Sequence, residues 1–396
     1  MKKKLEAMIN ESEIVEYLEK LESQNLLRKL SRSEGTDFSS NDYLSLSRDP
    51  KSLEAGFRAG KKFGTGSTGS RLLSGNKEIF EDFEKRIARD KHSESALIFN
   101  SGYIANSSVM SAFSAMGYLL IFDKLNHASM YQRDIGFATF GKNPFFETQN
   151  QKSENQKTQN QNLKRFPHLD YEKLEEILEK YKDSPKKLIA SETVFGMDGD
   201  KADIKILSEL AEKYNAILYL DEAHATGLYG QKGYGLSTDF QLNPRSTIIM
   251  GTFSKALASN GAYVACSELF KDFLIQVSKG FIYSTALSPF CIGVAQHNWE
   301  MIQNLDSVRC DIFTKADYLR NGLEKLGFRC VGSGTNIVPI IFDSTEKMLA
   351  THKNLLNKKI ITSAVRKPTS PTPRLRVAIN AQHTCEDIDL LLENLK

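Results

Sequence analysis

The chain has few residues of the kinds that build disulfide frameworks or metal sites. Its 396 residues include five cysteines and seven histidines. No Cys-x-x-Cys pair occurs, and no histidines cluster at metal-ligand spacing, so the sequence predicts no structural zinc and no other bound metal. Scattered cysteines are typical of proteins from a reducing compartment, and we expect a cytoplasmic protein.

An excess of charge and long apolar runs are also missing. Lys+Arg total 52 against 49 for Asp+Glu, a formal net charge of +3. No global field therefore favours nucleic acid or a membrane surface, and any anion site must be local. No apolar run approaches the ~20 residues that cross a bilayer. Glu6, Asn10 and Glu11 interrupt the stretch where an export signal would need apolar residues.

Short apolar runs alternate with helical patterns from about residue 38 onward. We expect strands at 96–99, 119–122, 188–190, 217–220, 247–250 and 262–265, with helices at 79–89, 104–115, 171–181 and 204–214. Unbroken apolar strands separated by helices indicate a largely parallel sheet that is covered on both faces. The sequence therefore predicts an α/β fold.

The pattern changes at both ends of this region. Apolar spacing at 11–30 predicts an amphipathic helix, and helices at 289–305 and 313–326 with strands at 337–342 and 375–379 predict a smaller α+β lobe. The predicted division is an N-terminal helical segment (1–40), a large domain (41–283) and a small C-terminal domain (284–396). Residues 148–162 include no apolar side chain, so we expect an exposed, mobile loop there.

The stretch 64–69 matches the dinucleotide fingerprint G-x-G-x-x-G in its letters only. A charged segment, 57–63, precedes it where a buried strand should end, so nicotinamide binding is not predicted. Its glycines still permit a tight loop close to an active site.

Four features lie at the ends of predicted strands, where open α/β sheets bind ligands. Asp221 follows the strand 217–220, and Lys255 follows 247–250; Ser101 to Asn106 and His127 follow two further strands. Each has an ordinary alternative: a surface carboxylate, a solvated lysine, a strand-to-helix turn and a structural histidine. Among small and apolar neighbours, however, a lysine loses solvent, and its amine becomes free for Schiff-base formation.

These features complement one another chemically. Backbone N–H groups at a helix N-terminus bind phosphate, an imidazole stacks on a flat ring, a carboxylate pairs with a pyridinium nitrogen, and an amine attacks an aldehyde. Together they match the requirements of pyridoxal 5′-phosphate (PLP).

With these residues in view, the chain resembles the α-oxoamine synthase family of fold-type I PLP enzymes, and most closely its 8-amino-7-oxononanoate synthases. The resemblance runs from about residue 27 to 395. It is carried by the motifs at 38–44, 64–75, 101–106, 126–129, 197–200, 221–227, 251–255, 283–285 and 374–376. It implies a large, mostly parallel sheet domain and a smaller α+β domain.

The resemblance also implies roles around the cofactor. Lys255 would bind PLP covalently and act as base, Asp221 would pair with the ring nitrogen, His224 would bond the ring hydroxyl, and His127 would stack on the ring and face the substrate. The phosphate would be held by Gly102, Tyr103 and Thr252, and by Ser284 and Thr285 of a neighbouring subunit. A homodimer with active sites at the subunit interface is therefore expected.

For the substrate, the resemblance implies that Arg376 binds the amino-acid carboxylate. Arg28, Asn41, Ser74 and Thr369 match positions on the acyl-donor or carboxylate side. The implied reaction is a decarboxylative condensation of L-alanine with a pimeloyl thioester, carried by coenzyme A or acyl-carrier protein, in biotin synthesis. Two departures stand out: Gly196 replaces a serine of many relatives, and the segment between Arg28 and residue 38 is shorter than usual.

Three alternatives stay open at this point. The nearest is another α-oxoamine synthase that uses glycine or serine with a different acyl thioester. An aminotransferase on the same fold would instead exchange amino groups with a keto acid. A protein that retains the fold without catalysis is disfavoured by the presence of Lys255, Asp221 and His224.

Overall fold

A computed structural model describes residues 11–28, 30, 32, 34–131, 162–332, 334–367 and 369–396. The predicted loop lies outside these ranges apart from Asn162. Contacts within the chain divide it into one unit that ends at Gly35 and a second that begins at Thr36. The first unit contains helix α2 (Glu11–Ser23), inside the predicted helical stretch. The domain boundaries at residues 40 and 283 stay predictions.

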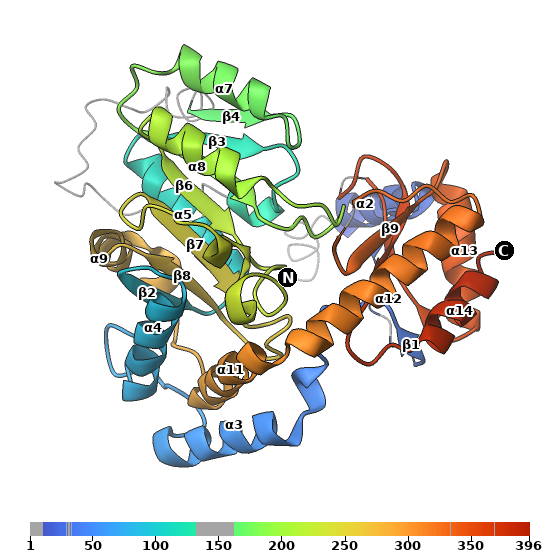
Figure 1. Cartoon of the computed structure of the whole chain (residues 1–396), viewed down its shortest axis with the longest axis horizontal. Helices are drawn as coiled ribbons and strands as arrows, with labels where there is room; N and C mark the ends of the chain where they lie inside the picture. Colours follow the sequence, from blue (N-terminus) through green and yellow to red (C-terminus); the bar gives the residue numbers. More distant parts are fainter. Residues whose placement is uncertain are drawn as a thin grey trace, which may run out of the picture. The chain divides into compact units, whose positions relative to one another are not determined.

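The second unit contains a seven-stranded sheet (Figure 1). Its strands are β2 (Ser95–Phe99), β3 (Leu119–Asp123), β4 (Leu163–Phe166), β5 (Lys187–Glu192), β6 (Ile217–Asp221), β7 (Thr247–Thr252) and β8 (Ala262–Cys266), in the order β2-β8-β7-β6-β5-β3-β4. Strand β8 is antiparallel to both of its neighbours, and all other pairs are parallel. The predicted α/β fold is confirmed.

Strand β4 was not predicted from the sequence. Its four residues include Lys164 and Arg165, and it lies at an edge of the sheet, beside β3 alone. An edge strand is paired on one side only and is partly exposed, so it can contain charged residues. This strand therefore has no apolar run by which the sequence could identify it.

Helices cover both faces of the sheet. Leu188 and Ala190 of β5 pack into a cluster with α5 (Gly102–Ala115), α9 (Glu268–Val277) and α10 (Lys279–Ile282). Ile189, between them, packs with α7 (Tyr171–Lys180) and α8 (Ile204–Lys213) on the opposite face. Successive side chains of a strand point to opposite faces. Both faces of this sheet are buried, which explains the unbroken apolar runs in the sequence.

A third cluster joins the sheet to the C-terminal region through α4 (Glu78–Asp90), α11 (Pro289–Met301) and α12 (Asp306–Lys325). Helix α11 also packs on α3 (Pro50–Phe63). A Cβ atom at Gly293 would lie 2.4 Å from Cβ of Ala59, so the glycine permits this close helix contact.

The C-terminal region has two small sheets. Strands β9 (Ile337–Ile341), β11 (Ser363–Val365) and β12 (Arg374–Ala378) form an antiparallel sheet with β12 at its centre, and β1 (Thr36–Asp37) pairs with β10 (Ile360–Ile361). Helices α13 (Thr345–Asn357) and α14 (Cys385–Glu393) complete the region (Figure 1). The central position of β12 holds its two arginines, Arg374 and Arg376, in a fixed register.

Within the described ranges, no helix is both long and apolar enough to cross a membrane. The same ranges contain no group of three or more side chains that could hold a metal ion.

Candidate active site

A cavity of about 210 Å³ opens at the carboxyl ends of β5, β6 and β7 and the N-terminus of α5. Parallel strands of an open α/β sheet commonly bind ligands at this edge. The cavity is lined by Ser101, Gly102, Tyr103, Asn106, His127, Ser129, Glu192, Asp221, Ala223, His224, Met250, Thr252, Ser254 and Lys255. Seven residues predicted from the sequence are among them: Gly102, Tyr103, His127, Asp221, His224, Thr252 and Lys255.

Lys255 reaches the cavity from the loop that follows β7. Its Nζ atom lies 2.7 Å from Nε2 of His224. Burial lowers the pKa of Lys255 to about 8, although Asp221 and Glu192 act in the opposite direction. A substantial fraction of the amine is therefore neutral near physiological pH, as a nucleophile or base requires.

Asp221 is the last residue of β6, and both of its carboxylate oxygens accept hydrogen bonds. Asn106 Nδ2 donates to Oδ2 over 2.8 Å, and the backbone N–H of Ala223 donates to Oδ1 over 2.9 Å. The Tyr219 hydroxyl donates to Oδ1 of Asn106, which turns the amide NH₂ toward Asp221. These contacts fix the orientation of the carboxylate in the cavity wall.

Glu192 lines the cavity but was not predicted from the sequence. It is the register partner of Asp221 across β5 and β6, and its Oε2 accepts the backbone N–H of Gly196 over 3.3 Å. Burial, reinforced by the nearby Asp221 carboxylate, raises the pKa of Glu192 to about 8. The sequence did contain an indication of this residue, because Glu192 closely follows the predicted strand 188–190, as Asp221 follows 217–220.

His127 is held by a short hydrogen-bonded chain. Its Nδ1 lies 2.7 Å from the Ser129 hydroxyl, which accepts Nδ2 of Asn106 over 2.9 Å. The same Asn106 amide contacts Asp221, so one side chain orients both predicted ring contacts. Burial lowers the pKa of His127, the nearby Asp221 carboxylate opposes this shift, and Lys255 adds to it.

The N-terminus of α5 has donors that suit an anion. The Ser101 hydroxyl caps the helix by accepting the N–H of Ile104 over 3.2 Å. Other N–H groups of a first helical turn have no partner within the helix, and the helix dipole favours an anion beside them. Across the cavity, the Thr252 and Ser254 hydroxyls lie 2.7 Å apart. This combination of donors suits a phosphate group.

Arg376 does not line this cavity, but hydrogen bonds connect it to the cavity wall. Its Nε donates to the Gly196 carbonyl, and its Nη2 donates to Asn41 Oδ1 over 2.9 Å and to the Tyr43 hydroxyl over 3.2 Å. The Tyr43 hydroxyl in turn lies 2.7 Å from Nδ1 of His224. Two predicted residues, Asn41 and Arg376, are thus brought together, and Tyr43 is a contact that the sequence did not indicate.

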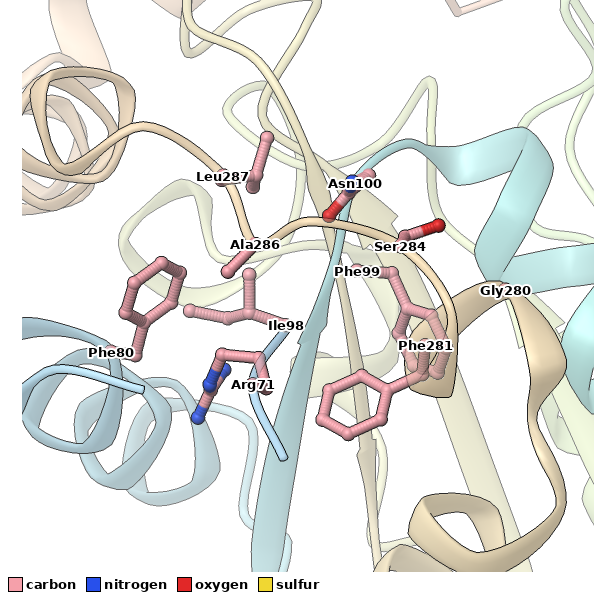
Figure 2. A pocket seen from close by; sticks show the side chains of 10 residues that line it. All are labelled: Arg71, Phe80, Ile98, Phe99, Asn100, Gly280, Phe281, Ser284, Ala286 and Leu287. Carbon is pink, nitrogen blue, oxygen red and sulfur yellow. The ribbon is translucent and has the colours of Figure 1, made fainter. Parts of the chain in front are cut away.

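Other predicted residues lie elsewhere. Ser284 lines a separate pocket of about 10 Å³ beyond the end of β2, and Figure 2 shows its side chain near Asn100. Asn100 Nδ2 donates to the backbone carbonyl of Thr285 over 2.7 Å. Thr285, Ser74 and Thr369 are exposed. Like Ser284, they do not line the cavity at Lys255. Arg28 belongs to the separate unit that ends at Gly35.

The chain matches the family "Aminotransferase class I and II" over residues 33–395. A Bacillus cereus (strain Q1) protein provisionally named 8-amino-7-oxononanoate synthase is 37% identical over 361 residues, which cover 91% of this chain and 86% of that protein.

Two solved structures share the fold. Serine palmitoyltransferase from S. paucimobilis, with a bound PLP–myriocin aldimine, has a TM-score of 0.81 at 24% identity, covering 96% of this chain and 95% of that one. An 8-amino-7-oxononanoate synthase from Francisella tularensis has a TM-score of 0.72 at 23% identity, covering 91% and 96%. The chain belongs to the aminotransferase class I and II family and, within it, to the α-oxoamine synthases, which are PLP-dependent acyltransferases of fold-type I.

Proposed function

We propose that the enzyme condenses L-alanine with a pimeloyl thioester and releases CO₂, a free thiol and 8-amino-7-oxononanoate, a step of biotin synthesis. The name and 37% identity of the Bacillus cereus relative support this choice of substrates. The fold is shared equally by serine palmitoyltransferases, so another amino acid and acyl thioester form the alternative.

One observation carries the proposal: a partly buried amine, a buried carboxylate and a helix N-terminus meet in a single cavity. Lys255 is suited to hold PLP covalently, Asp221 to pair with its ring nitrogen, and Gly102, Tyr103 and Thr252 to bind its phosphate. When bound, PLP withdraws the electron pair that is left at the amino-acid Cα when a proton or CO₂ departs.

The residues of the chain would then handle protons and orientation. Because burial lowers the pKa of Lys255 to about 8, its amine can accept the Cα proton of the amino acid and later return one. His127 would cover the ring from one side, and His224 would hydrogen-bond its hydroxyl. Burial lowers the pKa of both histidines and so favours neutral imidazoles, which suit both roles.

Arg376 would bind the substrate carboxylate. Its guanidinium is buried and held by the Gly196 carbonyl and Asn41, so little entropy is lost when it binds a carboxylate. We propose that Ser284 and Thr285 complete the phosphate site of a second subunit, since neither lines the cavity of its own chain. Arg28, Ser74 and Thr369 remain candidates for the acyl-donor side.

In the test, purified enzyme that has been loaded with PLP is incubated with pimeloyl thioester and one amino acid: alanine, glycine or serine. We expect CO₂ release and 8-amino-7-oxononanoate with alanine, at a kcat/KM above the values for the other two. Turnover with serine or glycine but not alanine would support the alternative. Amino-group transfer to a keto acid without any thioester would contradict both.

A further inference from the structure

We propose that Tyr43 is a positioning residue that determines which ring nitrogen of His224 carries the proton and, through His224, the protonation state of Lys255. The inference rests on the proposed function in one respect, that Lys255 is the reactive amine. It concerns the protein alone, without cofactor or substrate.

Side chains from distant parts of the sequence form a continuous hydrogen-bonded chain. Nζ of Lys255 lies 2.7 Å from Nε2 of His224, and Nδ1 of His224 lies 2.7 Å from the Tyr43 hydroxyl. That hydroxyl lies 3.0 Å from Oδ1 of Asn41. Arg376 Nη2 donates to both Asn41 and Tyr43. Tyr43 is fully buried and His224 is 8% exposed, so bulk water has little access to replace a lost partner.

The chain allows two arrangements of protons. His224 is neutral, because burial together with the charges of Lys255 and Arg376 holds its pKa well below the usual range. One ring nitrogen of a neutral imidazole therefore donates and the other accepts. The Tyr43 hydroxyl has a single proton, which goes either to Nδ1 of His224 or to Asn41.

The two arrangements differ in the states of Lys255 that they allow. If Tyr43 donates to Nδ1, the proton of His224 is on Nε2, and Lys255 must be a neutral amine to accept it. If Tyr43 donates to Asn41, its oxygen accepts a hydrogen bond from Nδ1–H, and Nε2 accepts one from Lys255, which can then be charged; a charged Lys255 is compatible with this arrangement alone. The hydroxyl can serve either arrangement, which permits Lys255 to gain and lose a proton without leaving an unpaired polar atom.

Removing the hydroxyl should favour the neutral amine. In Tyr43→Phe, a charged Lys255 would force a buried Nδ1–H to remain without an acceptor, whereas a neutral Lys255 leaves only an unpaired ring nitrogen. Buried N–H groups without acceptors are the rarer and costlier case. Asn41→Leu should act in the same direction, because the Tyr43 proton then has His224 as its remaining acceptor in the chain.

Other charges around Lys255 remain in both variants. Asp221 at the end of β6 and Glu192 at the end of β5 raise the pKa of Lys255, and Arg376 of β12 lowers it. His127, from the loop after β3, interacts with both Lys255 and His224. A change common to the two variants therefore reports on the hydrogen-bonded chain.

The experiment measures the rate at which Lys255 of the cofactor-free protein reacts with 1-fluoro-2,4-dinitrobenzene between pH 6 and pH 10, by peptide mass spectrometry. We expect an apparent pKa of about 8 for the parent protein and a value lower by roughly half a unit to one unit in Tyr43→Phe and Asn41→Leu. The control is Tyr263→Phe, which removes an equally buried hydroxyl that bonds Thr226 over 3.0 Å and should leave the value unchanged.

An unchanged or raised pKa in Tyr43→Phe would overturn the proposal. If circular dichroism shows that this variant does not fold, Asn41→Leu decides by the same criterion. An equal decrease in Tyr263→Phe would also overturn it, since the effect would then follow from any buried tyrosine. Failure of the alanine assay would contradict the proposed substrates but leave this readout intact, because no substrate is present.

Discussion

The backbone of Gly196 lies so close to the His224 imidazole that a Cβ atom at Gly196 would be 2.2 Å from Nε2. Gly196→Ser should therefore displace the imidazole and separate it from Lys255. We expect a loss of about 1–3 kcal/mol in the free energy of unfolding and a drop in kcat/KM of roughly tenfold or more, since the groups around the reacting atoms move.

Thermal unfolding, PLP titration and the alanine assay would check this expectation. Gly60→Ser is the matched control, because a Cβ there would meet Phe290 at an ordinary 4.0 Å. Full activity of the Gly196 variant with unchanged PLP affinity would show that His224 can move at no cost.

Arg376→Lys should weaken amino-acid binding. A lysine cannot reproduce the fork of an arginine, and we expect the KM for alanine to rise by roughly 10–100-fold. Arg374→Lys is the comparison, two residues away on β12 and equally buried. Arg374 bonds Asp198 and the Met197 carbonyl, so its replacement should reduce thermal stability more than it changes KM. Equal KM values for parent and Arg376→Lys would refute the carboxylate-binding role.

Glu192→Gln should change how stability depends on pH. The pKa of Glu192 is about 8 in the folded protein against an ordinary 4.5, so the native state holds a proton that the unfolded chain has lost between these values. The stability contributed by that proton is complete below pH 4.5 and is lost as pH rises through 8.

Relative to the glutamine variant, the parent protein should lose up to about 1.4 kcal/mol per pH unit over this window. Urea unfolding of the cofactor-free protein at pH 5 and pH 8 measures the difference. The exposed Glu212→Gln provides the baseline. Parallel pH profiles for parent and Glu192→Gln would contradict a protonated Glu192.

His168→Asn should destabilise the protein most at low pH. Burial lowers the pKa of His168, but hydrogen bonds of 2.9 Å with Asp123 and with Asp200 raise it to about 10. The folded state therefore binds a proton that the unfolded chain releases above about 6.5. The resulting stability is complete below pH 6.5 and is lost as pH rises through 10.

We expect His168→Asn to cost about 3 kcal/mol at pH 6 and clearly less at pH 10. Melting temperatures across this range would measure it, with the exposed His92→Asn as control. His92 has a φ of 54°, a conformation that asparagine tolerates. A deficit that is constant with pH would indicate lost packing rather than a lost ion pair.

Much of the fold could be predicted because the central strands are buried on both faces. The run at 217–220, for example, contains four apolar residues and became β6 (Ile217–Asp221). Strand β4 has no such apolar run, because two of its four residues are Lys164 and Arg165. Its pairing with β3 at the sheet edge stabilises it, and the sequence does not show that pairing. The antiparallel direction of β8 could not be predicted either, because strand periodicity is the same in both directions.

The site was predicted in part for the same reason. Asp221 and Lys255 each follow an apolar strand, and parallel strands bring their carboxyl ends to one edge. Glu192 met the same criterion, yet a carboxylate is most often solvated, and only its burial beside Asp221 distinguishes it. The small sheet that holds Arg376 lies far along the sequence, so its link to Lys255 through Tyr43 could not be derived from spacing.

Hydrophobic periodicity and local motifs are properties of neighbouring residues, and they were enough to predict the central strands, the helices between them, the family and the residue types that suit PLP. The folded structure was needed to show which of those residues share a cavity, that Gly196 leaves room for the His224 ring, and that the pKa values of Lys255 and Glu192 both lie near 8. Burial and charge pairing arise between segments that only the fold brings together, and no local pattern specifies them.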